Sequence, residues 1–114
     1  MTPKREPNGV LLGSLEEQVL LAVVRTGAEA YGMNVRRELE SVTGRRVTIG
    51  AVYATLDRLE EKRLVESERT ATAEAAASRR VFAVTPAGAR SLALTRDTRE
   101  RLWTGVKLRT FGEV

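Results

Sequence analysis

The segment from Thr48 to Arg58 has residue types and spacing suited to reading a nucleic-acid groove rather than to catalysis. If it is a helix with Val52 and Leu56 turned inward, its outward side carries small residues followed by a hydroxyl and a guanidinium. Small side chains let a helix backbone approach a groove, and threonine and arginine hydrogen-bond to base edges. The helix N-terminus would add free N–H groups directed at phosphate. The predicted groove-facing residues are Gly50, Ala51, Ala54, Thr55 and Arg58.

Basic side chains lie on both sides of this segment. One basic pair precedes it, and a second pair opens a later strand, from which it would reach a neighbouring phosphate or the minor groove. These basic residues are Arg45, Arg46, Arg79 and Arg80. Thr48 is placed to cap the first turn of the helix. Tyr31 and Tyr53 either donate hydroxyls to phosphate or belong to the core, and the sequence leaves both alternatives open.

The composition removes most other kinds of chemistry. The chain has 114 residues, no cysteine and no histidine, which excludes disulfides, thiolate or imidazole metal sites and the common nucleophile–base pairs. Carboxylates remain, but most of them lie beside basic residues at helical spacing, as on solvated, salt-bridged helix surfaces. We therefore expect a protein that is not an enzyme and that needs no cofactor and no metal.

Charge and hydropathy indicate an anionic partner. The net charge is +4, with 19 basic and 15 acidic residues, which is the balance expected of a protein that binds a polyanion. No apolar run reaches the length of a signal peptide or of a helix that spans a bilayer. We expect a cytoplasmic protein without a membrane partner.

The elements that position these groups are three short helices, a hairpin and a longer last helix. Gly27 and Gly44 mark the ends of the first two helices, and Pro86 occupies the first position of the last one. Ser14 and Glu17 form a predicted capping box. The expected helices cover about 15–25, 31–43, 48–64 and 86–109, and the expected strands cover 64–69 and 79–84.

Apolar spacing predicts which sides of these helices are buried. In the first helix the apolar residues spread beyond one face, which suggests burial on two sides, and in the second helix the buried stripe includes Val42. The last helix is thinly apolar and is interrupted by Thr95, so a seam with a second copy is the favoured way to bury it. The predicted dimerisation residues are Leu15, Leu92, Leu102, Trp103 and Val106.

Three helices followed by a two-stranded hairpin form the winged helix-turn-helix arrangement, which mostly binds nucleic acid. We expect an α+β fold, mainly α, with an N-terminal arm (1–13), a winged helix-turn-helix domain (14–85) and a C-terminal dimerisation helix and tail (86–114). The main alternative is a protein–protein adaptor, because winged helices also serve as protein-binding modules. An adaptor would need an exposed apolar patch on the third helix, where the sequence has small and polar residues. DNA compaction by charge alone is a further alternative.

Several short motifs occur along the chain in a specific order and at specific spacing. They are Tyr31-Gly32 at the start of the second helix, Gly50 to Tyr53 followed by Thr55-Leu56 and Arg58-Leu59-Glu60 in the third, and Thr85 to Gly88 after the hairpin. Together, over roughly Leu11 to Gly88, the chain resembles the PadR family of bacterial transcriptional regulators.

This resemblance implies a homodimeric repressor that binds a palindromic operator in double-stranded DNA through a winged domain and dimerises through its C-terminal helix. The chain is similar to the short branch of the family. Relatives lose operator affinity when small aromatic compounds bind, and some hold flat hydrophobic compounds at the dimer interface. By that resemblance Trp103 would line a pocket for an aromatic effector, the alternative being a tryptophan packed into the dimer core.

The chain departs from the family pattern at several positions. Arg63 stands where a glycine usually ends the third helix, which predicts that this helix end closes differently. The hairpin tip lacks the usual glycines. Met33 replaces an aromatic residue and Phe82 replaces a tyrosine, so contacts that depend on those rings or hydroxyls are not expected.

Overall fold

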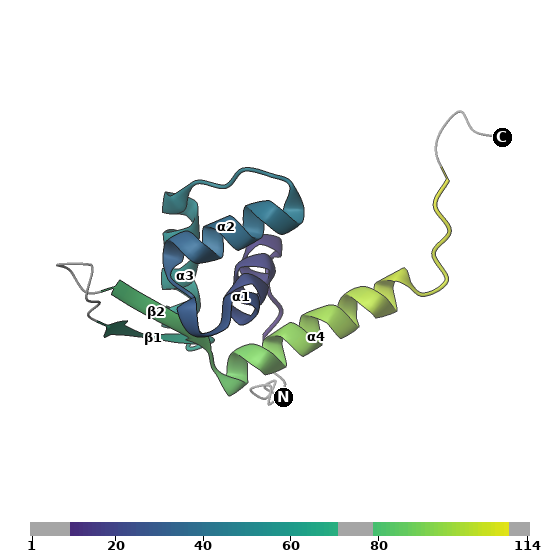
Figure 1. Ribbon diagram of the computed structural model, residues 1–114. Helices are drawn as coiled ribbons and strands as arrows, with labels where there is room; N and C mark the ends of the chain where they lie inside the picture. Colours follow the sequence, from purple (N-terminus) through teal and green to yellow (C-terminus); the bar gives the residue numbers. More distant parts are fainter. Residues whose placement is uncertain (1–9, 71–78, 110–114) are drawn as a thin grey trace.

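The computed structural model describes residues 10–70 and 79–109. Within these ranges, three helices form a compact group, a hairpin lies beside them, and the last helix extends away as an arm (Figure 1). The elements are α1 (Ser14–Thr26), the 3-10 helix η1 (Gly27–Glu29), α2 (Gly32–Thr43), α3 (Ile49–Glu61), β1 (Val65–Thr70), β2 (Arg79–Val84) and α4 (Pro86–Trp103). The predicted fold is confirmed: it is a mostly helical winged helix-turn-helix, with β1 and β2 as the wing.

One hydrophobic core joins the three helices to the wing. Its largest fully buried side chain is Phe82 of β2, and Leu20 of α1 and Val35 of α2 are fully buried with it. α3 contributes Val52 and Leu56, which are also fully buried. Since these two residues face inward as predicted, the opposite side of α3 faces solvent.

Some apolar residues that the sequence placed in the core lie on the surface. Val42, predicted to continue the buried stripe of α2, is exposed, and so are Leu21 and Val24 of α1. The expectation of two buried sides on α1 is therefore wrong within one chain, because the second side contacts solvent. Pattern alone could not separate burial in the chain's own core from burial against a partner.

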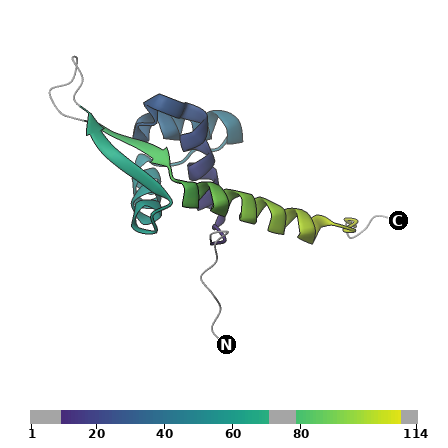
Figure 2. The same ribbon diagram turned by 90° about the horizontal axis from the view of Figure 1, so that it is seen from below.

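The wing is anchored to the start of α2. β1 and β2 form an antiparallel pair, and the N–H of Phe82 in β2 donates to the carbonyl oxygen of Ala30 at 3.0 Å. A single β-bridge also joins Tyr31 to Val81. Figure 2 shows the hairpin extending to one side of the helices and α4 to the other. The predicted loose tip of the hairpin falls in residues 71–78, outside the described residues.

The N-terminus of α1 differs from the predicted capping box. Gly13 is the N-cap, and its N–H donates to Glu16 Oε1 at 3.0 Å, so the box assigned to Ser14 and Glu17 is wrong. The Glu17 carboxylate instead forms an ion pair with Arg99 of α4 at 3.0 Å. The two carboxylates of the first turn therefore have different roles, one capping α1 and the other holding α4.

Stability is expected to fall at acidic pH in part through Glu16. Its carboxylate accepts a hydrogen bond from Lys62 Nζ at 2.7 Å, and this bond holds the pKa of Glu16 below its ordinary value of 4.5, with the Gly13 N–H acting in the same direction. A pKa that is lower in the folded chain stabilises the fold above pH 4.5, and this contribution is lost as the pH falls through the folded pKa. The contribution is expected to be about 0.5–1 kcal/mol for such a partly exposed pair.

The measurement is urea denaturation of the wild type and a Glu16→Gln variant between about pH 3 and pH 7. The wild type should be more stable at neutral pH, and the difference should shrink as the pH is lowered. Glu29→Gln, which replaces an exposed carboxylate, serves as the control. A difference that stays constant with pH would contradict the assignment to Glu16.

α3 ends in a left-handed residue even though that residue is not glycine. Arg63 has φ of 64°, and the following N–H, that of Leu64, donates to the carbonyl oxygen of Leu59 at 2.9 Å. The prediction of a differently closed helix end is therefore wrong, because Arg63 adopts the conformation that glycine commonly supplies. An L-residue in this conformation carries strain of about 1–2 kcal/mol.

An Arg63→Gly variant is expected to be more stable than the wild type by about 0.5–1 kcal/mol, the relieved strain minus the entropic cost of glycine. Chemical denaturation measures the difference. Arg63→Ala is the matched control, since it removes the same side chain but keeps the strained φ. Equal stability of the glycine and alanine variants would show that backbone strain is not the cause.

The start of α4 is tied to the end of α3. The Thr85 hydroxyl accepts the N–H of Gly88 at 3.0 Å and donates to the carbonyl oxygen of Arg63 at 2.8 Å, which confirms Thr85 as the cap of this helix. The far end differs from the prediction: α4 ends at Trp103 rather than near Arg109. The last six described residues therefore do not extend the helical arm.

Two buried hydroxyls of α4 bind the segment before α1. The N–H groups of Val10 and Leu12 donate to Ser91 Oγ and Thr95 Oγ1, each at 3.0 Å. Thr95, which interrupts the apolar side of α4 in the sequence, is thus a docking point rather than a defect in burial. Of the predicted N-terminal arm, residues 1–9 lie outside the described residues.

Candidate nucleic-acid interface

The exposed side of α3 is bare near its start and charged one turn later. Gly50 and Ala54 are exposed, Ala51 is half-buried, and a Cβ at Gly50 would meet no atom within 4 Å. Arg58 is exposed on the same side. The predicted outward position of Thr55 is wrong: this residue is 1% exposed, and its hydroxyl donates to the carbonyl oxygen of Ala51 at 2.8 Å. Among the predicted groove-facing residues, Arg58 is thus the one that presents a long polar side chain to solvent.

The N-terminus of α3 has basic groups around it, as predicted. Thr48 caps the helix, with its Oγ1 accepting the N–H of Ala51 at 3.0 Å. Arg45 and Arg46 are exposed in the connection from α2. Arg46 and Thr48 also line a surface hollow of about 370 Å³, to which α2 contributes both the basic Arg36 and the acidic Glu40.

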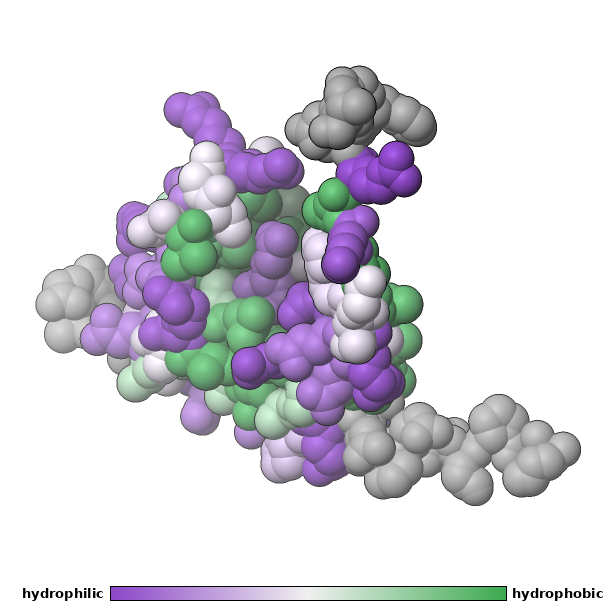
Figure 3. All heavy atoms as spheres, turned by 90° about the vertical axis from the view of Figure 1, so that its right-hand side faces the viewer, coloured by the Kyte–Doolittle hydropathy of each residue, from purple (hydrophilic) through white to green (hydrophobic). Residues whose placement is uncertain are grey.

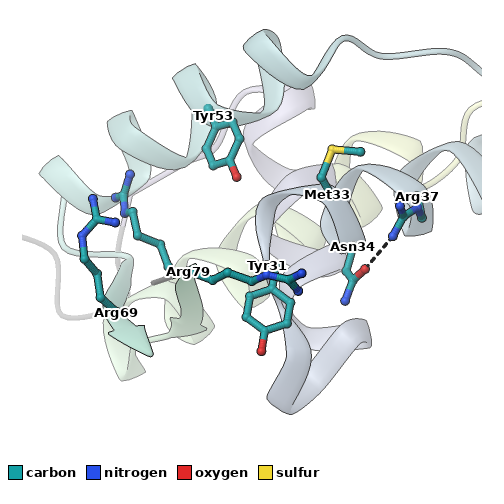
Figure 4. A pocket seen from close by; sticks show the side chains of 8 residues that line it. Tyr31, Met33, Asn34, Arg37, Tyr53, Arg69 and Arg79 are labelled. Atoms are coloured by element: carbon teal, nitrogen blue, oxygen red, sulfur yellow. Dashed lines mark hydrogen bonds between the residues drawn. The ribbon is translucent and has the colours of Figure 1, made fainter. Parts of the chain in front are cut away.

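A larger hollow opens between the wing and the N-terminal parts of α2 and α3 (Figure 4). Its volume is about 460 Å³, and its lining holds four arginines and no carboxylate. Two of them, Arg69 and Arg80, lie directly opposite each other in the β1–β2 pair, an arrangement that repels unless an anion or an acidic side chain is near. We call this site the basic hollow; its lining residues are Tyr31, Met33, Asn34, Arg37, Tyr53, Arg69, Arg79 and Arg80.

Both tyrosines lie at the basic hollow rather than in the core. Tyr53 projects from α3 (Figure 4), and an added Cβ at Gly32 of α2 would overlap the tyrosine ring, so the glycine leaves room for this ring. Tyr31 is half-buried, and the guanidinium of Arg79 lies 4.8 Å from the centroid of its ring. Such stacking orients the arginine without neutralising it, which leaves its charge available to an anion.

The two arginines that begin β2 differ in their partners. Arg79 is exposed and stacks on Tyr31, as described above. Arg80 instead forms ion pairs with Glu60 at 2.6 Å and Asp57 at 3.2 Å, both on α3. Carboxylates of the same chain therefore contact its guanidinium in this structure, and the reach of Arg80 to a neighbouring phosphate stays a prediction.

The sequence did not identify half of the basic hollow. Asn34 and Arg37 lie one turn apart on α2, with Arg37 Nη1 donating to Asn34 Oδ1 at 3.0 Å. Their helical spacing was visible, but nothing local showed that this side of α2 faces the wing. Arg69 is brought opposite Arg80 by the strand register, which the sequence could have suggested once both strands were paired. Met33 is the fourth lining residue that the sequence did not identify.

The predicted dimerisation residues divide into two groups. Leu15 and Leu92 are half-buried against the core of the same chain. Leu102, Trp103 and Val106 are 72%, 58% and 47% exposed and line a shallow hollow of about 160 Å³ at the end of α4. Figure 3 shows further hydrophobic surface on the side of the molecule toward which α4 extends.

Residues 10–70 and 79–109 show neither a membrane-spanning helix nor a metal site. No helix there has both the length and the apolar character needed to cross a bilayer. The same part of the chain contains no group of three or more acidic side chains arranged to hold a metal ion.

Comparison with known proteins identifies one family. The model of the transcriptional regulator PadR-like family matches residues 20–94, which include the second half of α1, all of α2 and α3, both strands of the wing and the first half of α4. A comparison with curated proteins finds no match.

Several solved structures share the fold. A PadR-like transcription factor from Bacteroides fragilis is 22% identical with a TM-score of 0.68, covering 77% of this chain and 82% of its own. A PadR-like transcriptional regulator from Bacillus cereus is 22% identical with a TM-score of 0.65, and the coverages are 79% and 84%. A PadR family transcriptional regulator from Eggerthella lenta is 22% identical with a TM-score of 0.61, covering 80% of each chain.

Proposed function

From the premise that the chain belongs to the transcriptional regulator PadR-like family, whose members are not enzymes, we propose that it is a sequence-specific DNA-binding repressor. The observation that carries this proposal is the basic hollow beside the bare, exposed side of α3. α3 would lie in a major groove, with Gly50, Ala51 and Ala54 allowing close approach and Arg58 contacting base edges. Arg79 and Arg37 would bind the adjacent sugar–phosphate backbone.

The alternative of a protein–protein adaptor has less support. An adaptor surface on α3 would present contiguous apolar side chains. The exposed side of α3 carries Tyr53 as its only large apolar group among the described residues, together with charged and small residues. DNA compaction by charge alone would need the arginines, but it would not need the open space around Gly50 that lets the α3 backbone approach a groove.

The test is selection of binding sites from random double-stranded DNA, followed by affinity measurements on the selected and a scrambled site. The wild type should prefer the selected site, and Arg58→Ala should lose about 1–3 kcal/mol of that preference. Arg101→Ala, which removes an exposed arginine from α4, is the control. Equal affinity for both sites would reject sequence-specific binding, and an Arg58→Ala variant that keeps the preference would reject Arg58 as a reading residue.

We further propose that two copies bind a palindromic operator as a homodimer in the cytoplasm. The exposed Leu102, Trp103 and Val106 support a seam between two α4 helices, because large apolar groups clustered on a surface favour association. Two α3 helices related by a two-fold axis would contact two half-sites in opposite orientations. Sedimentation of the wild type and Leu102→Glu tests this: the wild type should be dimeric and the variant monomeric.

An aromatic effector that releases the repressor would bind between the paired α4 helices, with Trp103 in its wall. The exposure of Trp103 in a single chain supports this position, while a tryptophan closed into the dimer core is the competing arrangement. Titration with planar aromatic compounds should quench the fluorescence of Trp103, the single tryptophan, and weaken DNA binding over the same concentrations. Quenching without weaker DNA binding would show that the compound binds near Trp103 but does not release the protein from DNA.

A further inference from the structure

Glu60 of α3 is held by both strands of the wing. Its Oε1 accepts a hydrogen bond from Arg80 Nη2 of β2 at 2.6 Å, and its Oε2 accepts one from Ser67 Oγ of β1 at 2.8 Å. Arg80 Nη1 also reaches Asp57, one turn earlier on α3, at 3.2 Å. The guanidinium lies 4.8 Å from the centroid of the Phe82 ring, whose side chain is fixed in the core. One carboxylate thus connects α3 to two strands.

We propose that Glu60, Arg80 and Ser67 form a clamp that positions the wing relative to α3 for DNA binding. The inference rests on the proposed function, because it concerns the two surfaces that would contact DNA at the same time. α3 and the wing meet different parts of the duplex, so their relative position decides whether both can bind together. Glu60 and Arg80 are positioning residues in this arrangement, and Arg80 acts through Glu60 rather than through a phosphate.

The charges of these groups support that role. Asp57 is exposed on the side of α3 proposed to face DNA, and Glu60 is half-buried beside it, so both would repel phosphate if their charge were not balanced. Arg80 balances them within the chain. The presence of Asp57 and Glu60 so close to the proposed interface is explained if these two carboxylates hold the wing in place.

The clamp and simple electrostatics predict opposite effects of a Glu60→Gln substitution. Removal of a negative charge beside DNA would by itself tighten binding. The clamp predicts weaker binding, by about fivefold to tenfold, because the neutral amide loses the ion pair with Arg80 and puts an NH2 group in place of one of the two oxygens that accept from Arg80 and Ser67. Glu61→Gln is the matched control: it removes the same charge from the next, exposed position, and should leave the affinity unchanged or slightly raised.

The affinity for the selected DNA site is measured by fluorescence anisotropy over a range of salt concentrations. Glu60→Gln and Arg80→Gln should each weaken binding, and the double variant should be no weaker than either single variant because one contact is lost in all three. Arg80→Gln should leave the salt dependence unchanged, whereas loss of a phosphate contact lowers the slope by about 0.9. Arg80→Lys should bind as weakly as Arg80→Gln, since one ammonium cannot span both carboxylates as the guanidinium fork does.

Hydrogen exchange in the free protein gives a readout that does not depend on DNA. The amides of β1 and β2 should exchange faster in Glu60→Gln than in the wild type or Glu61→Gln. The clamp is rejected by unchanged exchange, by Glu60→Gln binding as tightly as the wild type, or by a reduced salt slope for Arg80→Gln. If the wild type shows no DNA site preference, the proposed function fails, and the exchange measurement still decides whether Glu60 holds the wing.

Discussion

A Gly88→Ala variant is expected to lose about 3 kcal/mol of unfolding free energy. An added Cβ would lie 2.1 Å from the carbonyl oxygen of Leu64 and 2.9 Å from Val84 Cγ1. The same carbonyl oxygen accepts the N–H of Thr85 at 3.1 Å, so the backbone cannot move away without disturbing the junction between the wing and α4. The gain from alanine in a helix, about 1 kcal/mol, is smaller than the cost of this clash.

Thermal denaturation at a fixed protein concentration would show this loss as a decrease in Tm of about 10–20 °C. Gly50→Ala is the matched control, because this glycine is also helical and an added Cβ would meet nothing within 4 Å. The control variant should be slightly more stable than the wild type, by about 0.5 kcal/mol. If both variants behave alike, close packing at Gly88 does not limit stability.

Several helix caps were predictable from the sequence because their energetics are local, although the capping box of α1 and the closure of α3 were not. Gly44 adopts a left-handed φ of 70° at the end of α2, and Thr48 and Thr85 each accept an N–H from the first turn of the helix that they precede. These features depend on a few neighbouring residues, whose types are visible in the sequence. The order of helices and strands follows from them, and with it the fold.

Side-chain placement at the interface was less predictable, since it depends on tertiary contacts. Thr55 lies at the edge between the buried and exposed sides of α3, where helical periodicity alone does not decide its direction. Arg80 was correctly placed in the wing, but its partners Asp57 and Glu60 are more than 15 residues away along the chain. Nothing in the spacing around Arg80 indicated that it faces α3 rather than DNA.

The docking of α4 shows a further limit of apolar patterns. Thr95 is polar, so it lowered the expected burial of this helix, yet Thr95 and the equally polar Ser91 are both buried, and each accepts an N–H group from the N-terminal segment. A buried hydroxyl with a partner costs little. The exposed Leu21 and Val42 show the reverse case, in which an apolar residue predicted to be buried has no covering element within the described chain.

The basic hollow should account for most of the salt dependence of DNA binding. A triple variant, Arg37→Gln, Arg69→Gln and Arg79→Gln, removes three guanidinium groups that line the hollow and form no ion pair within the described residues. Each phosphate contact contributes about 0.9 to the slope of log affinity against log salt. The slope should therefore decrease by about 2.7 for one subunit, and by about 5.4 if two subunits bind a palindromic site.

At about 0.1 M salt a slope change of 2.7 corresponds to an affinity loss of several hundredfold, nearly equal for specific and scrambled DNA. A triple variant of α4, Arg90→Gln, Arg96→Gln and Arg101→Gln, is the control because it lowers the net charge by the same amount on the helix that extends away from the wing (Figure 1). Equal losses in the two triple variants would mean that binding responds to total charge. A loss confined to the first would place the phosphate backbone in the basic hollow, and its magnitude would distinguish one bound subunit from two.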